Sequence, residues 1–234
     1  MTRPSRRPAA SRLAWIAALG ALLAVLASDT VLAATPIYVR PGGDDMLCNG
    51  TVDVDHSAGV QPACAVKTIQ KGVDLVDVGG TVNVAAGTYS EDVAIGAAKD
   101  GISIVGAGEG STTIDVAGHS GGGGQSGISI EADDVTLEGF TMDSNGAAPP
   151  NSPRYGVRFL VVSGGTLQHV TITDLYRSGL DAPSVSDMTF DDITATDNGG
   201  NGLGLRDISD STISNITTSG NAWGGVRIQT WEGP

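Results

Sequence analysis

Residues 179–182, Gly179-Leu180-Asp181-Ala182, show the pattern that decides the fold: a glycine, an apolar residue, a free position and a second apolar residue. The pattern recurs at intervals of 23 residues. Its other copies are Gly156-Val157-Arg158-Phe159, Gly202-Leu203-Gly204-Leu205 and Gly225-Val226-Arg227-Ile228. An earlier copy, Gly127-Ile128-Ser129-Ile130, begins 29 residues before Gly156. A fixed period of this size, made of short β-type runs, predicts a solenoid and not a single globular core.

Two later positions of the repeat are also apolar in the copies that start at Gly156, Gly179 and Gly202. Eleven and fourteen residues after the glycine stand Leu167 and Val170, Phe190 and Ile193, and Ile213 and Ile216. The copy that starts at Gly127 fits after deletion of one residue, with Leu137 and Phe140 at these places. Such columns suit coils stacked about 4.8 Å apart, because each side chain then rests on its counterpart. The sequence therefore predicts an all-β fold, a right-handed parallel β-helix with three short strands in each coil.

The segment before the regular repeat predicts a cap for this stack. Between Thr68 and Val76, the side chains of Ile69, Val73 and Val76 share one helical face, which predicts a short amphipathic helix covering the open N-terminal end. Short strands are expected near residues 81–84, 93–95 and 102–104, with a turn at 86–88. The extra residues of the 29-residue coil are assigned to a projecting loop at 146–153.

The first 33 residues have the pattern of a signal peptide. A positive stretch (Arg3, Arg6, Arg7 and Arg12) precedes an apolar run from Leu13 to Ala27, and Val31-Leu32-Ala33 supplies small residues for cleavage. The apolar run is shorter than the roughly 20 residues of a membrane span, although an uncleaved anchor remains the alternative. We therefore expect a secreted or cell-surface protein with no membrane span after cleavage.

The two cysteines and the charge balance indicate how the N-terminal arm is held and which kinds of binding partner are excluded. Cys48 and Cys64 are expected to form a disulfide that staples an irregular arm at residues 34–66, with two free thiols as the alternative. The β-helix is then expected over residues 67–234. The formal net charge is −13, which excludes non-specific binding to nucleic acids and to anionic membranes.

Five of the six arginines after residue 33 fall on one strip of the predicted β-helix. Residues two and four places after the repeat glycine point outward, because side chains alternate along a strand. With the turns before the strands, these positions define an arginine strip of Arg154, Arg158, Arg177, Arg206 and Arg227, with Tyr155 and Trp223 beside them. Arginine binds carboxylates through two parallel hydrogen bonds, and an aromatic ring stacks on a sugar. The strip predicts a binding site for an extended anionic or polyhydroxylated ligand, unless the arginines merely pair with neighbouring acids.

Asp181 is the single carboxylate at the centre of this strip, between coils that carry Arg158 and Arg206. It is open to three interpretations: a base, a cation ligand or a salt-bridge partner.

Asn198 and Asn221 share one place in the repeat, which indicates a structural asparagine ladder at a turn. The three histidines lie in separate segments, so none is predicted to be catalytic.

Three N-terminal motifs resemble those of the pectin-lyase-like superfamily of parallel β-helix proteins. They are Cys64–Gln70, Gly80–Tyr89 with its Gly-Thr-Tyr turn, and Ile104–Gly108 with its Gly-x-Gly turn. Together with the repeats, the resemblance covers roughly residues 37–234. It implies that a site, if present, lies along the first-strand face, where the arginine strip is expected. The superfamily includes lyases, hydrolases, epimerases, tailspikes and non-catalytic surface proteins, so the resemblance indicates the fold and leaves the function open.

Two functions are therefore predicted side by side. One is binding of an acidic, uronate-containing polysaccharide along the first-strand face. The other is catalysis of the lyase, hydrolase or epimerase type, in which Arg206 or Arg158 removes a proton and Asp181 helps to hold calcium. Arg227-Ile228-Gln229 only partly resembles the Arg-Ile-Lys of polygalacturonases.

The uncapped last coil further predicts that the protein continues past Pro234, or that a partner or second copy covers this end.

Overall fold

The computed structural model describes residues 34–119, 125–147 and 153–230. These residues form one short helix, α1 (Ile69–Leu75), and fifteen strands. The strands are β1 (Ile37–Val39), β2 (Thr81–Val84), β3 (Gly87–Ser90), β4 (Val93–Ile95), β5 (Ser103–Gly106), β6 (Thr112–Asp115), β7 (Ser126–Ile130), β8 (Thr136–Asp143), β9 (Tyr155–Phe159), β10 (Thr166–Thr173), β11 (Leu180–Pro183), β12 (Thr189–Thr196), β13 (Asn201–Arg206), β14 (Thr212–Ser219) and β15 (Gly224–Gln229).

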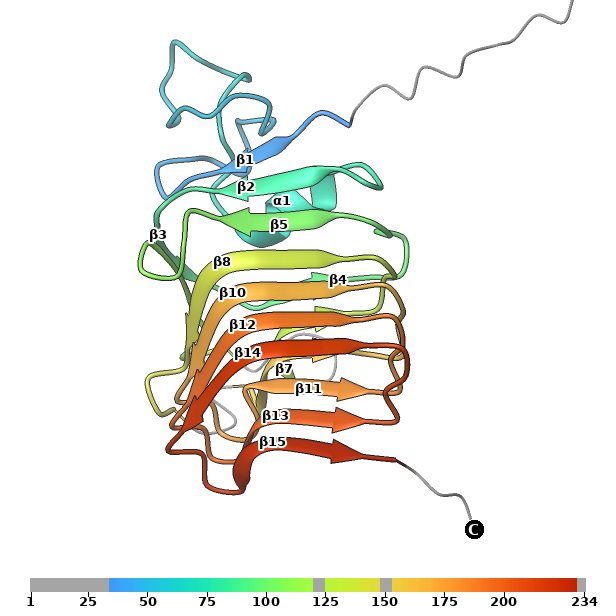
Figure 1. The fold of residues 1–234 in the computed structure, drawn as a ribbon. Coiled ribbons are helices and arrows are strands. Elements are labelled where there is room, and N and C mark those ends of the chain that lie inside the picture. The colour runs from blue at the N-terminus through green and yellow to red at the C-terminus, as the bar shows by residue number, and fades with distance from the viewer. Residues whose placement is uncertain (1–33, 120–124, 148–152, 231–234) are drawn as a thin grey trace, which may run out of the picture. The chain divides into compact units, whose positions relative to one another are not determined.

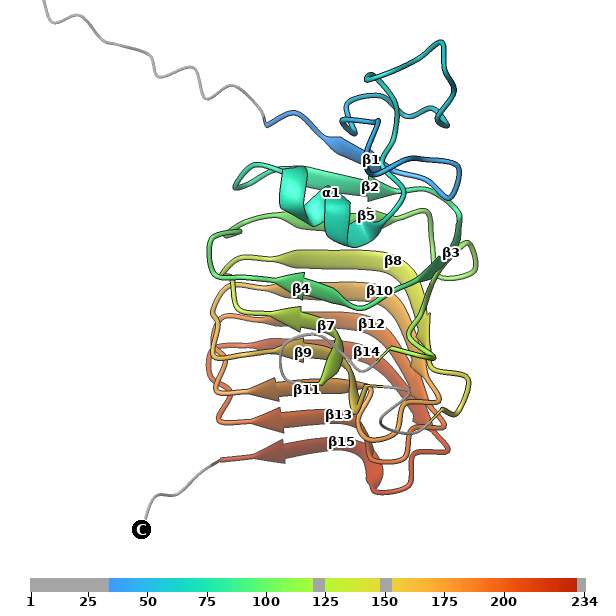
Figure 2. The ribbon, with the colours of Figure 1, turned by 180° about the vertical axis from the view of Figure 1, so that it is seen from behind.

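The strands make two sheets in which every pairing between named strands is parallel. The nine-stranded sheet runs β1-β2-β5-β8-β10-β12-β14, with β3 and β6 beside this path. The six-stranded sheet runs β4-β7-β9-β11-β13-β15. The chain alternates between the two sheets, so successive coils lie one below the other (Figures 1 and 2). This is the parallel β-helix that the repeat predicts.

The predicted register is confirmed at every column of the repeat. Leu180 pairs with Val157 in the preceding coil and with Leu203 in the following one. Leu137 pairs with Leu167, as expected after deletion of one residue. The apolar columns meet between the sheets in one continuous core, whose largest fully buried side chains include Phe140, Phe159 and Phe190.

The second and third strand segments of the later coils are fused. β8, β10, β12 and β14 are each eight residues long and bend at residues with positive φ, namely Gly139, His169, Asp192 and Asn215. In the first coils the same segments are separate strands, since β5 and β6 both pair with β8. The three-segment coil is thus kept throughout, and one left-handed residue makes the corner in the later coils.

The other corners are also single left-handed residues, and they recur at the period of the repeat. Their columns are Val161, Ser184 and Asp207; Gly164, Asp187 and Asp210; and Asp174, Asp197 and Gly220. Seven of the thirteen described non-glycine residues with positive φ are aspartates, a residue that tolerates this conformation. Much of the acidity of the later coils therefore follows from corner geometry and does not by itself indicate a cation site.

Helix α1 lies at the N-terminal end of the stack, where it contacts β1, β2 and β4 (Figure 2). Its predicted face is confirmed, because Ile69, Val73 and Val76 are buried. Thr68 is the N-cap and accepts a hydrogen bond from the Lys71 N–H at 3.2 Å. The carboxylate of Glu91 accepts hydrogen bonds from the N–H groups of Ile69 and Gln70, at 2.8 and 2.9 Å.

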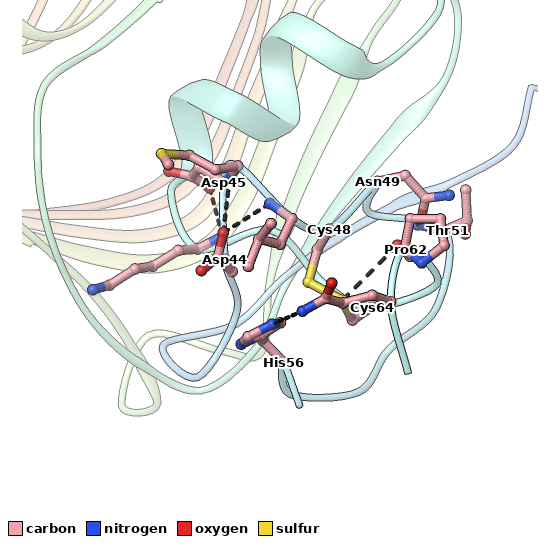
Figure 3. Close-up of a disulfide and its surroundings, with 12 residues drawn as sticks. Asp44, Asp45, Cys48, Asn49, Thr51, His56, Pro62 and Cys64 are labelled. Carbon is pink, nitrogen blue, oxygen red and sulfur yellow. Dashed lines mark hydrogen bonds between the residues drawn. A yellow bond between two sulfur atoms is a disulfide. The ribbon is translucent and has the colours of Figure 1, made fainter. Parts of the chain in front are cut away.

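The arm before α1 is more regular than the sequence predicts, because Ile37–Val39 forms β1 and extends the nine-stranded sheet. The predicted disulfide joins Cys48 to Cys64, with their Cα atoms 5.0 Å apart (Figure 3). Asp45 accepts hydrogen bonds from the N–H groups of Lys67 and Thr68, so the stapled loop is tied to the start of the helix.

The turn expected at residues 86–88 is shorter, because β3 already begins at Gly87. Across this turn, the hydroxyl group of the buried Tyr89 donates a hydrogen bond to the Ala85 carbonyl at 2.9 Å. The centre of the loop expected at 146–153 lies outside the described residues, as does the predicted signal peptide at 1–33. Within the described segments, no helix has the length and apolar character that a membrane crossing requires.

Candidate functional site

The arginine strip lies on the outer face of the six-stranded sheet, over β9, β11, β13 and β15. Strand pairing places Arg158, Asp181, Gly204 and Arg227 in one row across four neighbouring coils. Arg206 stands in a different row, where it pairs with Pro183 on one side and Gln229 on the other. The coil after Asp181 therefore offers a glycine, and not the arginine, as the direct neighbour of the carboxylate.

Arg158 and Asp181 form a largely buried ion pair. The Arg158 Nε donates to the Asp181 Oδ2 at 2.7 Å, and the side chains are 19% and 9% exposed. Of the three interpretations that the sequence left open for Asp181, the salt-bridge partner is the one seen here. The second carboxylate oxygen, Oδ1, lies on the side of Gly204, 3.6 Å from where a Cβ on that glycine would stand.

Two aromatic rings order the guanidinium groups at the turn before the strands. The Tyr155 ring centroid lies 4.8 Å from the Arg158 Cζ and 5.5 Å from the Arg177 Cζ. Arg177 in turn lies over the Trp223 ring at 4.9 Å. Such cation–π contacts hold the cations without neutralising their charge. The result is a row of alternating arginine and aromatic side chains along one edge of the strip.

A hollow of about 300 Å³ opens between this row and the end of β13. Its lining includes Tyr155, Arg177, Ser178, Asp181, Asn201, Gly204, Arg206, Trp223, Arg227 and Gln229. Within the described part of the chain, neither Arg206 nor Arg227 forms an ion pair. Two uncompensated guanidinium groups thus face a hollow whose inner wall holds the Arg158–Asp181 pair.

A second, larger hollow of about 610 Å³ lies beside the first and shares Arg177 and Trp223 with it. Its lining also includes Arg154, Asp174, Tyr176 and Asp197. The Trp223 side chain stands at the border of both hollows and its residue is 56% exposed. The two hollows therefore meet at this indole and at Arg177.

The structure thus gathers seven of the eight predicted site residues around the smaller hollow: six line it, and Arg158 binds Asp181 at its wall. Arg154 lines only the larger one. Two lining residues without a predicted role are Ser178 and Asn201. The Asn201 N–H donates to the Ser178 Oγ at 3.3 Å. Their place in the turns before the strands was the available signal, but turn position alone did not distinguish them from structural polar residues.

Outside the strip, the expected asparagine ladder is confirmed. The Asn198 side chain donates to the Asn221 Oδ1 at 2.9 Å and accepts from the Leu175 N–H at 3.0 Å. The sequence places the three histidines in separate segments, yet His119 lies near a serine and an acid in the fold. Its Nε2 is 3.2 Å from the Ser90 Oγ and its Nδ1 is 4.0 Å from the Asp92 Oδ1. The second separation exceeds hydrogen-bond length, so we interpret this as a surface contact.

Calcium was the cofactor considered from the sequence. Among the residues in the three described segments, no group of three or more His, Cys, Asp or Glu side chains is placed to hold a metal ion. Asp181 has Arg158, and not a second carboxylate, as its charged neighbour. The residues present therefore do not make the oxygen-rich cluster that calcium requires.

Comparison with known families supports the fold. A family model described as "Right handed beta helix region" matches residues 126–231. No curated protein sequence gives a significant match. The family model supplies the handedness, and the chain has the right-handed parallel β-helix of the pectin-lyase-like fold.

Several solved structures match this chain at low sequence identity. A rhamnogalacturonan lyase superposes with a TM-score of 0.53 at 12% identity, covering 84% of this chain and 62% of its own. Pectin methylesterase PemA from Erwinia chrysanthemi gives a TM-score of 0.40 at 15% identity, covering 76% and 66%. ORF18 of Geobacillus virus E2 gives 0.49 at 18% identity, covering 64% and 32%. The chain thus spans between about a third and two thirds of the length of these structures, and at such identities the similarity shows the fold alone.

Proposed function

We propose that this protein is an exported β-helix protein that binds an acidic, uronate-containing polysaccharide along the outer face of the six-stranded sheet. The observation that carries the proposal is the hollow in which Arg206 and Arg227 stand without ion-pair partners among the described residues. The protein as a whole is strongly acidic, with a formal net charge of −13. Cations that remain uncompensated in such a chain favour an anionic ligand.

The geometry suits a carbohydrate better than a small inorganic anion. Trp223 is more than half exposed at the edge of the hollow, which Tyr155 and Arg177 also line. An aromatic ring stacks on a sugar ring, and a guanidinium binds a carboxylate through two parallel hydrogen bonds. The rhamnogalacturonan lyase that shares the fold is named for a polysaccharide substrate, which agrees with this proposal.

Binding is favoured over elimination by the state of the two residues predicted to be catalytic. Arg206 is exposed at the end of β13 and stands in a different row from Asp181, so strand pairing does not make the two predicted catalytic residues direct neighbours. Asp181 is engaged by Arg158 through Oδ2. The signal-like first 33 residues and the disulfide between Cys48 and Cys64 support export.

The test is titration of the purified protein with oligogalacturonate and with a neutral glucan of equal length, followed by calorimetry. We expect binding of the uronate only, and a loss of about tenfold or more in the Arg206→Gln/Arg227→Gln double variant. Arg40→Gln serves as a control, because Arg40 lies on the N-terminal arm and pairs with Asp53 and Asp55. Equal affinity for both glycans would contradict the proposal, and release of unsaturated uronate would replace binding by lyase activity.

A further inference from the structure

Asn201 is an unusual residue in the smaller hollow. It is only 6% exposed, yet its side-chain amide makes no hydrogen bond to any residue in the described segments. The neighbouring Asn198 shows the contrast, because its amide donates to the Ile172 carbonyl and to the Asn221 Oδ1. Among the described residues, the Ser126 Oγ is the one buried side-chain atom without a partner, so solvent reaches the Asn201 amide, and Asn201 lines the hollow. A ligand in the hollow can therefore use the free hydrogen-bonding capacity of this amide.

Two glycines keep the space beside Asn201 and Asp181 open. Gly224 pairs with Asn201 and lies in the coil after it. Gly204 pairs with Asp181 and likewise lies in the coil after that residue. A Cβ on Gly224 would stand 3.9 Å from the Asn201 Oδ1, and a Cβ on Gly204 would stand 3.6 Å from the Asp181 Oδ1. Both polar atoms therefore border volume that any larger residue in the next coil would fill.

The hydrogen-bonding chemistry of this pair is specific. The Asn201 amide offers an acceptor and two donors, whereas an ionised Asp181 offers only an acceptor at Oδ1. A sugar hydroxyl both donates and accepts, so it satisfies either group. A sulfate ester carries acceptor oxygens and negative charge, so it leaves Oδ1 without a donor and is repelled by the carboxylate.

We infer that Asn201, together with Asp181 in the same hollow, forms hydrogen bonds with free hydroxyl groups on one sugar unit of the ligand. The site therefore selects hydroxylated uronates over sulfated glycans. This inference rests on the proposed function, in which Arg206 and Arg227 take the carboxylate of the same ligand. It adds that charge alone does not determine affinity: a sulfated glycan with more negative charge binds less well than a uronate with free hydroxyls.

The test uses tetragalacturonate and a heparin tetrasaccharide as probes, titrated into the wild-type protein, Asn201→Ala and Asn83→Ala. Asn83 lies on β2 of the other sheet and is a matched control. We expect Asn201→Ala to weaken tetragalacturonate binding roughly tenfold while leaving the weaker heparin binding unchanged. Gly204→Val is a second variant, because it fills the space before Asp181 and leaves Asn201 intact; we expect the same loss. Circular dichroism verifies folding.

The outcomes separate the two proposals. If the wild-type protein does not bind tetragalacturonate, the proposed function and this inference both fail. If it binds, and neither Asn201→Ala nor Gly204→Val weakens binding, the proposed function stands and the role of Asn201 is overturned. An equal loss for both probes in Asn201→Ala overturns the hydroxyl selectivity. A loss confined to tetragalacturonate supports it.

Discussion

Arg158 and Asp181 are 23 residues apart in the sequence, yet they face each other in adjacent coils with 2.7 Å between Nε and Oδ2. Both side chains are largely removed from water, and loss of Asp181 removes the carboxylate that accepts a hydrogen bond from the Arg158 guanidinium there. We expect Asp181→Ala to lower the free energy of unfolding by about 2–4 kcal/mol. Urea denaturation measures this difference directly. The exposed Arg40–Asp55 pair is the control, and Asp55→Ala should lower it by less than about 1 kcal/mol. Similar losses at the two sites would contradict the burial argument.

Leu203 and Val226 occupy one column of the stack but differ in burial. Leu203 is fully buried between its neighbours, whereas Val226 is 44% exposed on β15. Leu203→Ala should lower the free energy of unfolding by about 2–5 kcal/mol, because it leaves a cavity between coils. Val226→Ala should lower it by less than about 1 kcal/mol. The two variants are compared by chemical denaturation, and equal losses would show that this column does not follow the burial seen here.

The fold was predictable because it is determined by the constant interval between apolar residues along the sequence. Stacking places Leu180 against Val157 and Leu203, so apolar residues at a constant interval admit a single register. The one-residue deletion that aligned the Gly127 coil followed from the same rule, and it is confirmed by the pairing of Leu137 with Leu167.

The details of the site were less predictable, for physical reasons. The spacing showed that Arg158 and Arg206 both point outward near Asp181, but the choice of ion-pair partner depends on rows and side-chain rotamers, which a period does not encode. The contact of His119 with Ser90 was missed because the first coils are irregular: β3 and β6 pair Gly87 with Thr112, an interval that departs from the later repeat. The open space beside the Asn201 amide depends on Gly224 in the following coil.

Val161 is a corner residue in an unfavourable conformation. Its φ is 57°, its residue is 75% exposed, and the same place in the next coils is held by Ser184 and Asp207. A β-branched side chain is disfavoured in the left-handed region, whereas glycine is free to adopt it. We expect Val161→Gly to raise the free energy of unfolding by about 1 kcal/mol. The adjacent, buried Val162 is the control, since Val162→Gly should lower stability. Thermal unfolding decides between them, and a loss of stability in Val161→Gly would contradict this interpretation.

Glu91 gives the N-terminal cap a pH dependence of stability. Burial raises the pKa of its carboxyl above the ordinary 4.5, although hydrogen bonds from the Gln70 and Ile69 N–H groups oppose the shift. The folded state therefore holds the proton more tightly than the unfolded chain, so this contribution is complete below the ordinary pKa and is lost as pH rises through the folded pKa. Glu91→Gln should remove that slope, even if it lowers absolute stability through one lost acceptor. Unfolding midpoints from about pH 4 to about pH 8 test this, and parallel curves for the two proteins would refute it.

Trp223 should contribute to ligand affinity through stacking, in contrast to the arginines. It lies over Arg177 on one side and borders both hollows, with more than half of its surface exposed. We expect Trp223→Ala to weaken oligogalacturonate binding by about tenfold, and Trp223→Phe by less. Because stacking is screened little by salt, the Trp223→Ala loss should persist at high ionic strength, whereas the Arg227→Gln loss should shrink. Calorimetric titrations at about 0.05 M and 0.5 M salt measure both effects.

Tyr176→Ala is the matched control, since Tyr176 is also an exposed aromatic residue but lines only the larger hollow. A loss of equal size in Tyr176→Ala, or a Trp223→Ala loss that disappears with salt, would show that the indole does not stack on a sugar bound in the smaller hollow.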